Sequence, residues 1–472
     1  MHLEKPREMK AENILRDLCG LALVLATGCA EVPQNTTDNN LTNTKAPQMT
    51  LREVSTTSEL IEAVQDASVK RIVVLKELSN VPMLRLSAGQ ALTASPSKET
   101  IRFAGGQDGL ELSSDNKIEN LVLVASPEKR AVFNDTTVSD LGRLELRNIT
   151  VDGIVQIIAM DRVRAGNIEA HDIEIRSADA REYSVRPKGY GVEVIPGAFT
   201  LWNQQADTSV TITADLTGIS AGLPNAPVRG SGIFVCGGGD AGGRLLVRRL
   251  ETGMVHSDAG IAEGTPDRIS AGVFTGYGTL VNNVHTLGTV TTYGPNDMVL
   301  DNWGVVDHWI SDKKVTSHGP SGIGFVNFGT ITTLNLKEPI ETFGQGARGF
   351  NVYSGTVANA EFDRIVTHGN GAVGIQISQP IGEISVLHGI ETFGGSGESL
   401  VKGVLTKLSA VAFSVKPEGS VRALNIAGGL ITHGPGVAPI EVQGVIESLL
   451  VKDKVAALKD QNKISQQTNK LN

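Results

Sequence analysis

A short motif returns along this chain at a constant interval of 25 residues. Each copy is a Ser or Thr followed by an aromatic residue or His and then by Gly, and the copies are Thr292-Tyr293-Gly294, Ser317-His318-Gly319, Thr342-Phe343-Gly344, Thr367-His368-Gly369 and Thr392-Phe393-Gly394. A fixed period of roughly 20–50 residues indicates a solenoid, in which each repeat is one supersecondary unit stacked on its neighbours. The periodicity therefore predicts the architecture.

Each repeat has the composition of three short strands. Between residues 321 and 344, an apolar run at 323–326 is followed by Gly329, by the alternating stretch 330–332 and by a third run that ends at the motif. A unit of this length has no room for a helix beside three strands, which excludes leucine-rich, ankyrin and tetratricopeptide repeats. Parallel strands about 4.8 Å apart and right-handed crossovers remain. We predict an all-β, single-stranded, right-handed parallel β-helix with coils of about 25 residues.

Glycine recurs in two columns of this repeat. One column is the last residue of the motif, and the second comprises Gly278, Gly304, Gly329, Gly355 and Gly382. Because glycine reaches positive φ without steric cost, we interpret the two columns as tight corners with positive φ.

The middle residue of the motif forms a column of rings that continues to His433. Stacked coils would place these rings about 4.8 Å apart, so we predict a ladder of flat side chains. Alternate histidines would lie about 10 Å apart, too far to share a metal ion. We therefore expect no metal site in this column.

The first half of the chain shows the same pattern less regularly. Segments such as 110–112 and 121–123 alternate apolar and polar residues, and Asn120, Asn148 and Asp172 precede strands as turn formers. Residues 58–64 lead into Ile72-Val73-Val74-Leu75, then Leu84-Arg85-Leu86-Ser87-Ala88-Gly89-Gln90-Ala91-Leu92 and Lys117-Ile118-Glu119-Asn120-Leu121. Over residues 51–450 the chain resembles the pectin-lyase-like superfamily of parallel β-helices. That resemblance implies the fold and a short helix that caps its N-terminal end, and many members act on polysaccharides.

A capping helix is expected near residue 57. Thr56 and Glu59 have the spacing of a capping box, and Leu60, Val64 and Ala67 would share one helical face.

Charge and glycine patterns exclude several partners and cofactors. The net charge is −9 without a basic block, which argues against nucleic acid and acidic lipid as partners. Residues 237–242 match G-x-G-x-x-G, but the residues that follow predict another strand, whereas a dinucleotide site needs a helix. We expect no cofactor and a monomer, with one domain at 51–450.

The two ends of the chain differ from the repeats. Residues 1–29 look like a bacterial lipoprotein leader with Cys29 as the lipidated residue, and residues 30–50 form a polar linker. The alternative is a cytosolic helix followed by a linker. Export would place the protein in the periplasm or at the cell surface, with a lipid anchor as its membrane contact. Residues 451–472 form a polar tail with a short helical patch at 455–458.

The coil at 296–314 holds the candidate catalytic residues Asp297, Asp301, Asp307 and His308. Two carboxylates in one groove could act as acid and base on a glycosidic bond. Against this, Trp303 aligns with Phe328, which suggests a second ring ladder. Asp301 aligns with Val326 in an inward column, where an acid would be either buried and paired or exposed by a register shift. The candidate carbohydrate-binding rings are Tyr183, Tyr190, Trp202, Trp303 and Trp309.

Function is expected where the repeat is interrupted. Interruptions lie at 181–229, near Asp301, and between Gly394 and Gly434, where the interval rises to 40 residues. We expect an extracytoplasmic solenoid that binds or displays, with polysaccharide as its partner and no catalytic motif. The alternative is a polysaccharide-active lyase, hydrolase or epimerase, which would require the four candidates at 297–308 to converge in an open groove.

Overall fold

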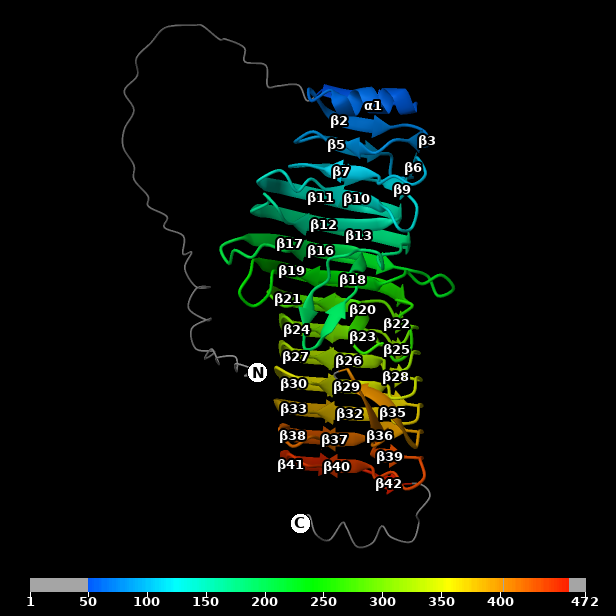
Figure 1. Ribbon diagram of the computed structural model, residues 1–472, viewed down its shortest axis with the longest axis vertical. Coiled ribbons are helices and arrows are strands. Elements are labelled where there is room, and N and C mark those ends of the chain that lie inside the picture. Colours follow the sequence, from blue (N-terminus) through cyan, green and yellow to red (C-terminus); the bar gives the residue numbers. More distant parts are fainter. Residues whose placement is uncertain (1–49, 402, 458–472) are drawn as a thin grey trace, which may run out of the picture. The chain divides into compact units, whose positions relative to one another are not determined.

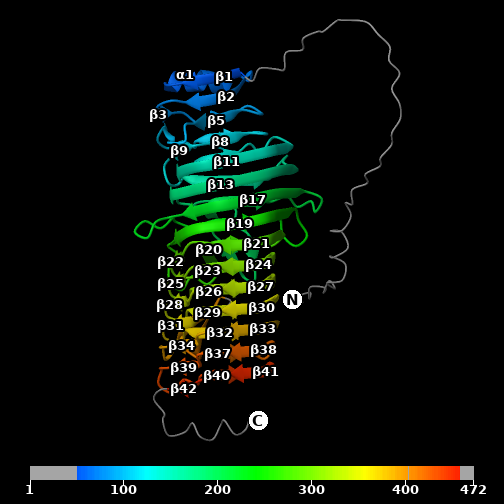
Figure 2. The same ribbon diagram turned by 180° about the vertical axis from the view of Figure 1, so that it is seen from behind.

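A computed structural model describes residues 50–401 and 403–457. These residues lie in the second of two compact units, Met49–Asn472. The unit is a parallel β-helix in which three rows of strands, here named faces 1, 2 and 3, run along a stack of coils (Figures 1 and 2). The fold predicted from the 25-residue period is confirmed.

Faces 1 and 2 belong to one sheet. Face 1 comprises β1 (Thr50–Val54), β2 (Val69–Val74), β5 (Ala91–Ala94), β8 (Lys117–Glu119), β21 (Thr279–Thr286), β24 (Val305–Ser311), β27 (Thr330–Leu336), β30 (Thr356–Phe362), β33 (Pro380–Val386), β38 (Ser420–Ile426) and β41 (Val445–Val451). Face 2 comprises β3 (Leu78–Val81), β6 (Glu99–Phe103), β9 (Leu121–Val124), β22 (Val290–Thr292), β25 (Val315–Ser317), β28 (Ile340–Thr342), β31 (Ile365–Thr367), β34 (Ile390–Thr392), β39 (Leu430–Thr432) and β42 (Val455–Ala457). Four long strands span both faces: β11 (Asp140–Asp152), β13 (Ala165–Ser177), β17 (Thr211–Ala221) and β19 (Arg244–Ser257).

Face 3 is a separate sheet. Its strands are β4 (Leu84–Arg85), β7 (Leu110–Leu112), β10 (Arg130–Asn134), β12 (Ile154–Ala159), β16 (Gly197–Asn203), β18 (Ser231–Cys236), β20 (Arg268–Thr275), β23 (Asp297–Asn302), β26 (Ile323–Asn327), β29 (Arg348–Val352), β32 (Val373–Ile377), β37 (Phe413–Val415) and β40 (Ile440–Val442). Strands in the later coils follow the order face 3, face 1, face 2, as the three-strand repeat predicted.

The long strands bend at residues in the left-handed region. Asn148 has φ 49° and Asp172 has φ 57°, and the preceding coil has Asn120 at φ 58°. Asn148 Nδ2 donates to Asn120 Oδ1 over 2.8 Å, which links two successive corners. Asn and Asp tolerate this conformation better than other non-glycine residues. The predicted turn formers therefore occupy the corner between faces 1 and 2.

One apolar core runs through the coils. On face 3, each coil contributes a buried inward side chain in register, and successive members are Val273, Leu300, Phe325, Phe350, Ile375 and Phe413. Trp309 enters this core from face 1, and its ring lies edge-on to Phe325 at a centroid distance of 4.9 Å. Burial of one apolar side chain stabilises a fold by roughly 1.5–3 kcal/mol, and the repeat supplies such a residue in every coil.

Helix α1 (Thr57–Gln65) lies at the N-terminal end of the described stack (Figure 1). Thr56 Oγ1 accepts from the Glu59 N–H, and Glu59 in turn accepts from the Thr56 N–H, so the predicted capping box is confirmed. The helix ends at Gln65, so Ala67 is exposed and Ala63 is buried instead. The prediction for Ala67 was wrong because the helix ends two residues before it.

The motif glycines are required by close packing between coils. None of them has positive φ, contrary to our interpretation. A Cβ on Gly319 would lie 1.8 Å from the Gly294 carbonyl oxygen, and one on Gly344 would lie 1.9 Å from that of Gly319. In the second column, only Gly278 and Gly355 have positive φ. Stacking of one corner directly on the next therefore excludes a side chain, whatever the backbone angles.

The predicted ring ladder is confirmed. Successive rings from Tyr293 to His433 stack with interplanar angles of 3–9° and centroid distances of 4.2–5.3 Å. His256 extends the column, because its Nδ1 lies 2.9 Å from the Tyr293 hydroxyl.

Alternation of His and Phe in the ladder reflects a two-coil period. Glu341 accepts a hydrogen bond from His368 Nε2 over 2.9 Å and pairs with Lys314. Fifty residues later, Glu391 accepts from His433 Nε2 over 2.7 Å and pairs with Arg364. Burial alone would raise the pKa of Glu391, but the bonds from His433 and Arg364 outweigh it and lower that pKa. Each Glu thus joins the coil before it to the coil after it.

Two segments leave the repeat and cover the outer surface of face 3. Residues 181–195 carry the short pair β14 (Lys188–Gly189) and β15 (Val192–Val194). The hairpin of β35 (Ser396–Val401) and β36 (Val404–Ser409) accounts for the 40-residue interval after Gly394. The last coil continues through β42, so residues 455–457 form a strand where we expected a helical patch. The predicted leader, Cys29 and the predicted linker up to residue 49 lie outside the described residues.

Candidate functional site

The four candidate catalytic residues do not converge. Asp297 and Asp301 lie on β23 in face 3 and are fully buried, whereas Asp307 and His308 lie exposed on β24 in face 1. The corner at Trp303 and Gly304 separates the two strands. The arrangement provides no groove in which the four could act on one bond.

Asp297 holds a corner together. Its carboxyl accepts from the Ser270 hydroxyl over 2.6 Å and from the N–H groups of Ala259 and Gly294 over 3.2 and 2.8 Å. Burial raises the pKa of Asp297 to about 7, because the ionised form loses its hydration and these hydrogen bonds only partly replace it. Asp297 therefore stabilises this corner through its hydrogen bonds, and its carboxyl holds a proton to a higher pH than an exposed Asp does.

Asp301 faces the outer side of face 3. It is paired in register with Phe274 on one side and Val326 on the other. Neither carboxyl oxygen has a hydrogen-bond partner among the described residues. Burial raises the pKa of Asp301 well above its usual range, and the nearby Trp303 indole offsets this only in part. A neutral, protonated carboxyl is the form that such a site favours.

The five candidate rings have different surroundings. Trp309 is in the core, and Trp202 is buried with its Nε1–H donating to the Gly237 carbonyl over 3.1 Å. Trp303 is buried beneath Tyr190, with ring centroids 5.1 Å apart, and Tyr183 is half-buried. Tyr190 alone among the five is exposed, at 44%. A sugar or other ligand could therefore reach Tyr190 but not the tryptophans.

The two segments that leave the repeat meet around one pocket on face 3. Residues 181–195 supply Tyr190 and Val192, and the β35–β36 hairpin supplies Leu400 and Gly403. Between them, the floor and walls come from face 3 and its loops: Pro266, Ile269, Asn296, Met298, Ser321, Ile323, Val326, Phe328 and Tyr353. The pocket opens to solvent and is largely apolar, which is typical of small-molecule sites.

Aromatic rings form one wall of this pocket. Tyr190 stacks on Phe328 with centroids 4.4 Å apart, and Phe328 stacks on Tyr353 at 5.3 Å. Trp303 lies behind them, 5.7 Å from Phe328, so the second ring column predicted from the register is present. Sequence reasoning missed the role of the hairpin, although the stretched interval at 394–434 marked its position.

A more polar hollow adjoins the pocket. The two share Asn296, Ser321 and Leu400. The hollow is also lined by Glu263 and Glu398, together with Gly264, Pro295, Pro320, Gln345 and Leu405. The apolar pocket thus has a rim with hydrogen-bonding groups on one side.

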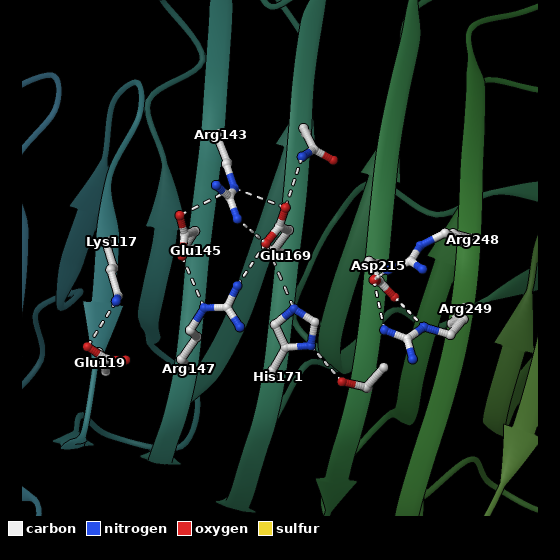
Figure 3. Close-up of polar contacts among 12 residues, drawn as sticks. Lys117, Glu119, Arg143, Glu145, Arg147, Glu169, His171, Asp215, Arg248 and Arg249 are labelled. Atoms are coloured by element: carbon white, nitrogen blue, oxygen red, sulfur yellow. Dashed lines mark hydrogen bonds and ion pairs between the residues drawn. The ribbon is translucent and has the colours of Figure 1, made fainter. Parts of the chain in front are cut away.

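A second candidate surface lies on face 1, where charged side chains extend across β8, β11, β13, β17 and β19 (Figure 3). Glu145, Glu169 and Asp215 occupy one column on successive coils. Arg143 and Arg147 both contact Glu169, at 2.7 and 2.8 Å.

The face 1 charges neutralise one another. Hydrogen bonding from Arg143 lowers the pKa of Glu169, although burial opposes this shift, and Asp215 pairs with Arg248 and Arg249. His171 lies beside the network with a pKa lowered by burial, and its Nδ1 contacts the Thr217 hydroxyl at 2.6 Å. Each carboxylate in this column forms a salt bridge with arginine, so these residues provide no free acid–base pair.

The described parts of the chain lack the features of two other classes of site. No group of three or more His, Cys, Asp or Glu side chains there has a metal-binding arrangement. No helix in residues 50–401 or 403–457 has the length and apolar character needed to cross a bilayer. After β18, residues 237–243 form a turn that leads into strand β19, so the strand predicted after the G-x-G-x-x-G match is confirmed.

Comparisons with known proteins returned no match: no family model, no curated protein and no solved structure is significantly similar to this chain.

Proposed function

We propose that this chain is a β-helical binding protein whose ligand site is the ring-lined pocket on face 3. The observation that carries the proposal is the meeting of two interruptions of the repeat, about 200 residues apart in sequence, on one face around this pocket. Insertions that interrupt a solenoid commonly carry its binding function. We also assign the chain to the pectin-lyase-like superfamily on its strand pattern.

Carbohydrate is the ligand class that this pocket fits. The apolar C–H face of a sugar can stack on an aromatic ring, and Tyr190 leaves its ring open to such contact. Sugar hydroxyls need nearby hydrogen-bonding groups, which Asn296, Ser321 and Gln345 supply along the rim. A polysaccharide chain could continue from the pocket into the adjoining hollow.

A polysaccharide-active enzyme is the second candidate function. One observation favours it: Glu263 and Glu398, which approach from different segments, line the same hollow. Two carboxyl groups across a sugar are the groups that glycoside hydrolysis requires. The binding function is preferred, because none of the described residues that line the ring-lined pocket is a carboxylate.

A glycan array followed by product analysis tests both functions. We expect glycan binding without new products, and Tyr190→Ala should weaken the binding about tenfold, since one aromatic contact contributes roughly 0.5–1.5 kcal/mol beyond its buried area. Tyr183→Ala is the matched control, because Tyr183 lies in the same segment but does not line the pocket. Failure of every glycan to bind, or equal losses in the two variants, would contradict the proposed site. Cleaved products that disappear in Glu263→Gln would establish the enzyme instead.

Export is part of the proposal, with Cys29 as the lipid-bearing residue. Radioactive palmitate should label the full-length chain in bacteria, and Cys29→Ala should abolish the label. Absence of label in the unaltered chain would refute the anchor.

A further inference from the structure

A guanidinium without a carboxylate partner lies under the β35–β36 hairpin. Arg348 on β29 is fully buried and forms no salt bridge with any residue that the structure describes. Its Nη2 donates to the Ser399 hydroxyl over 2.8 Å, whereas Nε and Nη1 have no partner in the described chain. Arginine keeps its charge at all physiological pH values, so this cation cannot be relieved by losing a proton.

The fold itself does not require an arginine at this position. Arg348 is paired in register with Ile323 and Val373, and Met298 precedes Ile323 in the same column. Three neighbouring coils therefore place apolar side chains where this coil has a charge. A buried ion costs several kcal/mol unless it is paired, so its presence calls for a counterion.

A second unpartnered polar side chain accompanies Arg348. Asn351 on the same strand is fully buried, and neither its Oδ1 nor its Nδ2 has a partner among the described residues. It follows Val326 in a column that packs on the outer side of face 3. An amide N–H and a guanidinium together form a donor set suited to a carboxylate.

These donors adjoin the proposed ligand pocket. Ile323 and Val326, which precede Arg348 and Asn351 in their columns, both line the pocket. The Arg348 Cζ lies 5.9 Å from the ring centroid of Tyr353, which also lines it.

The hairpin covers the donors and borders the same pocket. Ser399 contacts Arg348, and the next residue, Leu400, lines the pocket and is held by a bond from its N–H to the Ser321 hydroxyl over 3.1 Å. Displacement of this one hairpin would therefore join the pocket to the donors.

We propose that the pocket takes a ligand with an apolar ring face and one carboxylate, and that Arg348 and Asn351 bind the carboxylate beneath the β35–β36 hairpin. The inference rests on the proposed function, since it uses the same pocket. It adds the charge of the ligand and assigns the hairpin as the cover. The complementary charge explains why a costly cation interrupts an apolar column.

Matched acid and neutral probes test this inference by calorimetry on the full chain. The pairs are glucuronate with glucose and benzoate with benzamide, which separate a sugar acid from an aromatic acid. We expect at least one acid to bind ten or more times as tightly as its neutral partner. Arg348→Met should remove that preference and leave the affinity for the neutral probe unchanged, and Arg348→Lys should keep part of it.

The outcomes separate this inference from the proposed function. Neutral sugars that bind and depend on Tyr190, without any preference for acids, would overturn the carboxylate site but keep the pocket. Failure of all four probes to bind would overturn both. Arg348→Met should fold with an unchanged or higher Tm, because Met298 already occupies this column, and a matching loss of acid and neutral binding would mean that the arginine only supports the structure.

Discussion

Replacement of Asp297 by Asn should change how the stability of the β-helix depends on pH. Burial raises the pKa of Asp297 from its usual 3.8 to about 7 in the folded chain. In the unfolded chain the same group loses its proton near pH 4. A raised acid pKa means that this contribution to stability is fully present below pH 4 and is lost as the pH rises towards 7.

The size of the effect follows from the two pKa values. Each pH unit between them is worth about 1.4 kcal/mol, so Asp297 lowers the stability by about 4 kcal/mol between pH 4 and pH 7. Asn has the same shape and no charge, and its oxygen can accept from the Ala259 and Gly294 N–H groups as the carboxyl does. With an unfolding entropy of roughly 2.1 cal/mol/K per residue over about 400 residues, 4 kcal/mol corresponds to roughly 5 °C in Tm.

Thermal unfolding followed by circular dichroism at pH 4.5 and pH 8 measures this difference. The Tm of Asp297→Asn relative to the unaltered chain should rise by several degrees between the two pH values, while all other titrating groups cancel. Asp307→Asn is the matched control, because Asp307 is exposed in the same coil and its replacement should give the same small shift at both pH values. The reasoning fails if Asp297→Asn also shows equal shifts at pH 4.5 and pH 8, since the carboxyl would then be ionised throughout.

Two further predictions concern the ring ladder and its acids. Phe343→Ala should lower the free energy of unfolding by about 1–3 kcal/mol, because Phe343 stacks on His318 and His368 and each ring pair contributes roughly 0.5–1.5 kcal/mol. Chemical denaturation measures this change, and Leu405→Ala, at an exposed position, is the control. Glu391→Gln should destabilise the chain at pH 7, and this effect should decrease as the pH falls below about 4, because a lowered acid pKa gives stability that is lost as the pH falls through it. A Glu391→Gln penalty that does not change with pH in the acid range would show that charge is not its cause.

The repeat period and the composition predicted the architecture correctly, but they did not predict the contacts between coils. The 25-residue interval predicted three strands per coil and the ring column, because each coil repeats one environment. The same reasoning misjudged the motif glycines, since the approach of Gly319 to the Gly294 carbonyl depends on how two corners stack rather than on φ. Pairing of Glu341 with His368 was also hidden, because these residues lie in different columns of successive coils.

The position of the pocket could not be predicted from the sequence, for a different reason. Interruptions at 181–229 and 394–434 could be located, and both were expected to carry function. Nothing in a periodic pattern states on which face an insertion folds back, since its direction depends on contacts such as that of Tyr190 with Phe328. Solenoid periodicity therefore predicts where function can reside along the chain, whereas the meeting of two insertions requires coordinates.

In a solenoid, the residues at equivalent positions of successive coils form a column, and each residue can be compared with its neighbours in that column. A residue and its neighbours one coil away occupy nearly the same surroundings, so an apolar column shows what the fold accepts at that position. Asp301 between Phe274 and Val326 and Arg348 between Ile323 and Val373 depart from this reference in fully buried positions. Both departures lie on the outer side of face 3, in the coils that the covering segments reach. Stability alone would favour the column residues at both positions. For Arg348, whose neighbour Ile323 lines the pocket, the proposed ligand carboxylate explains the departure.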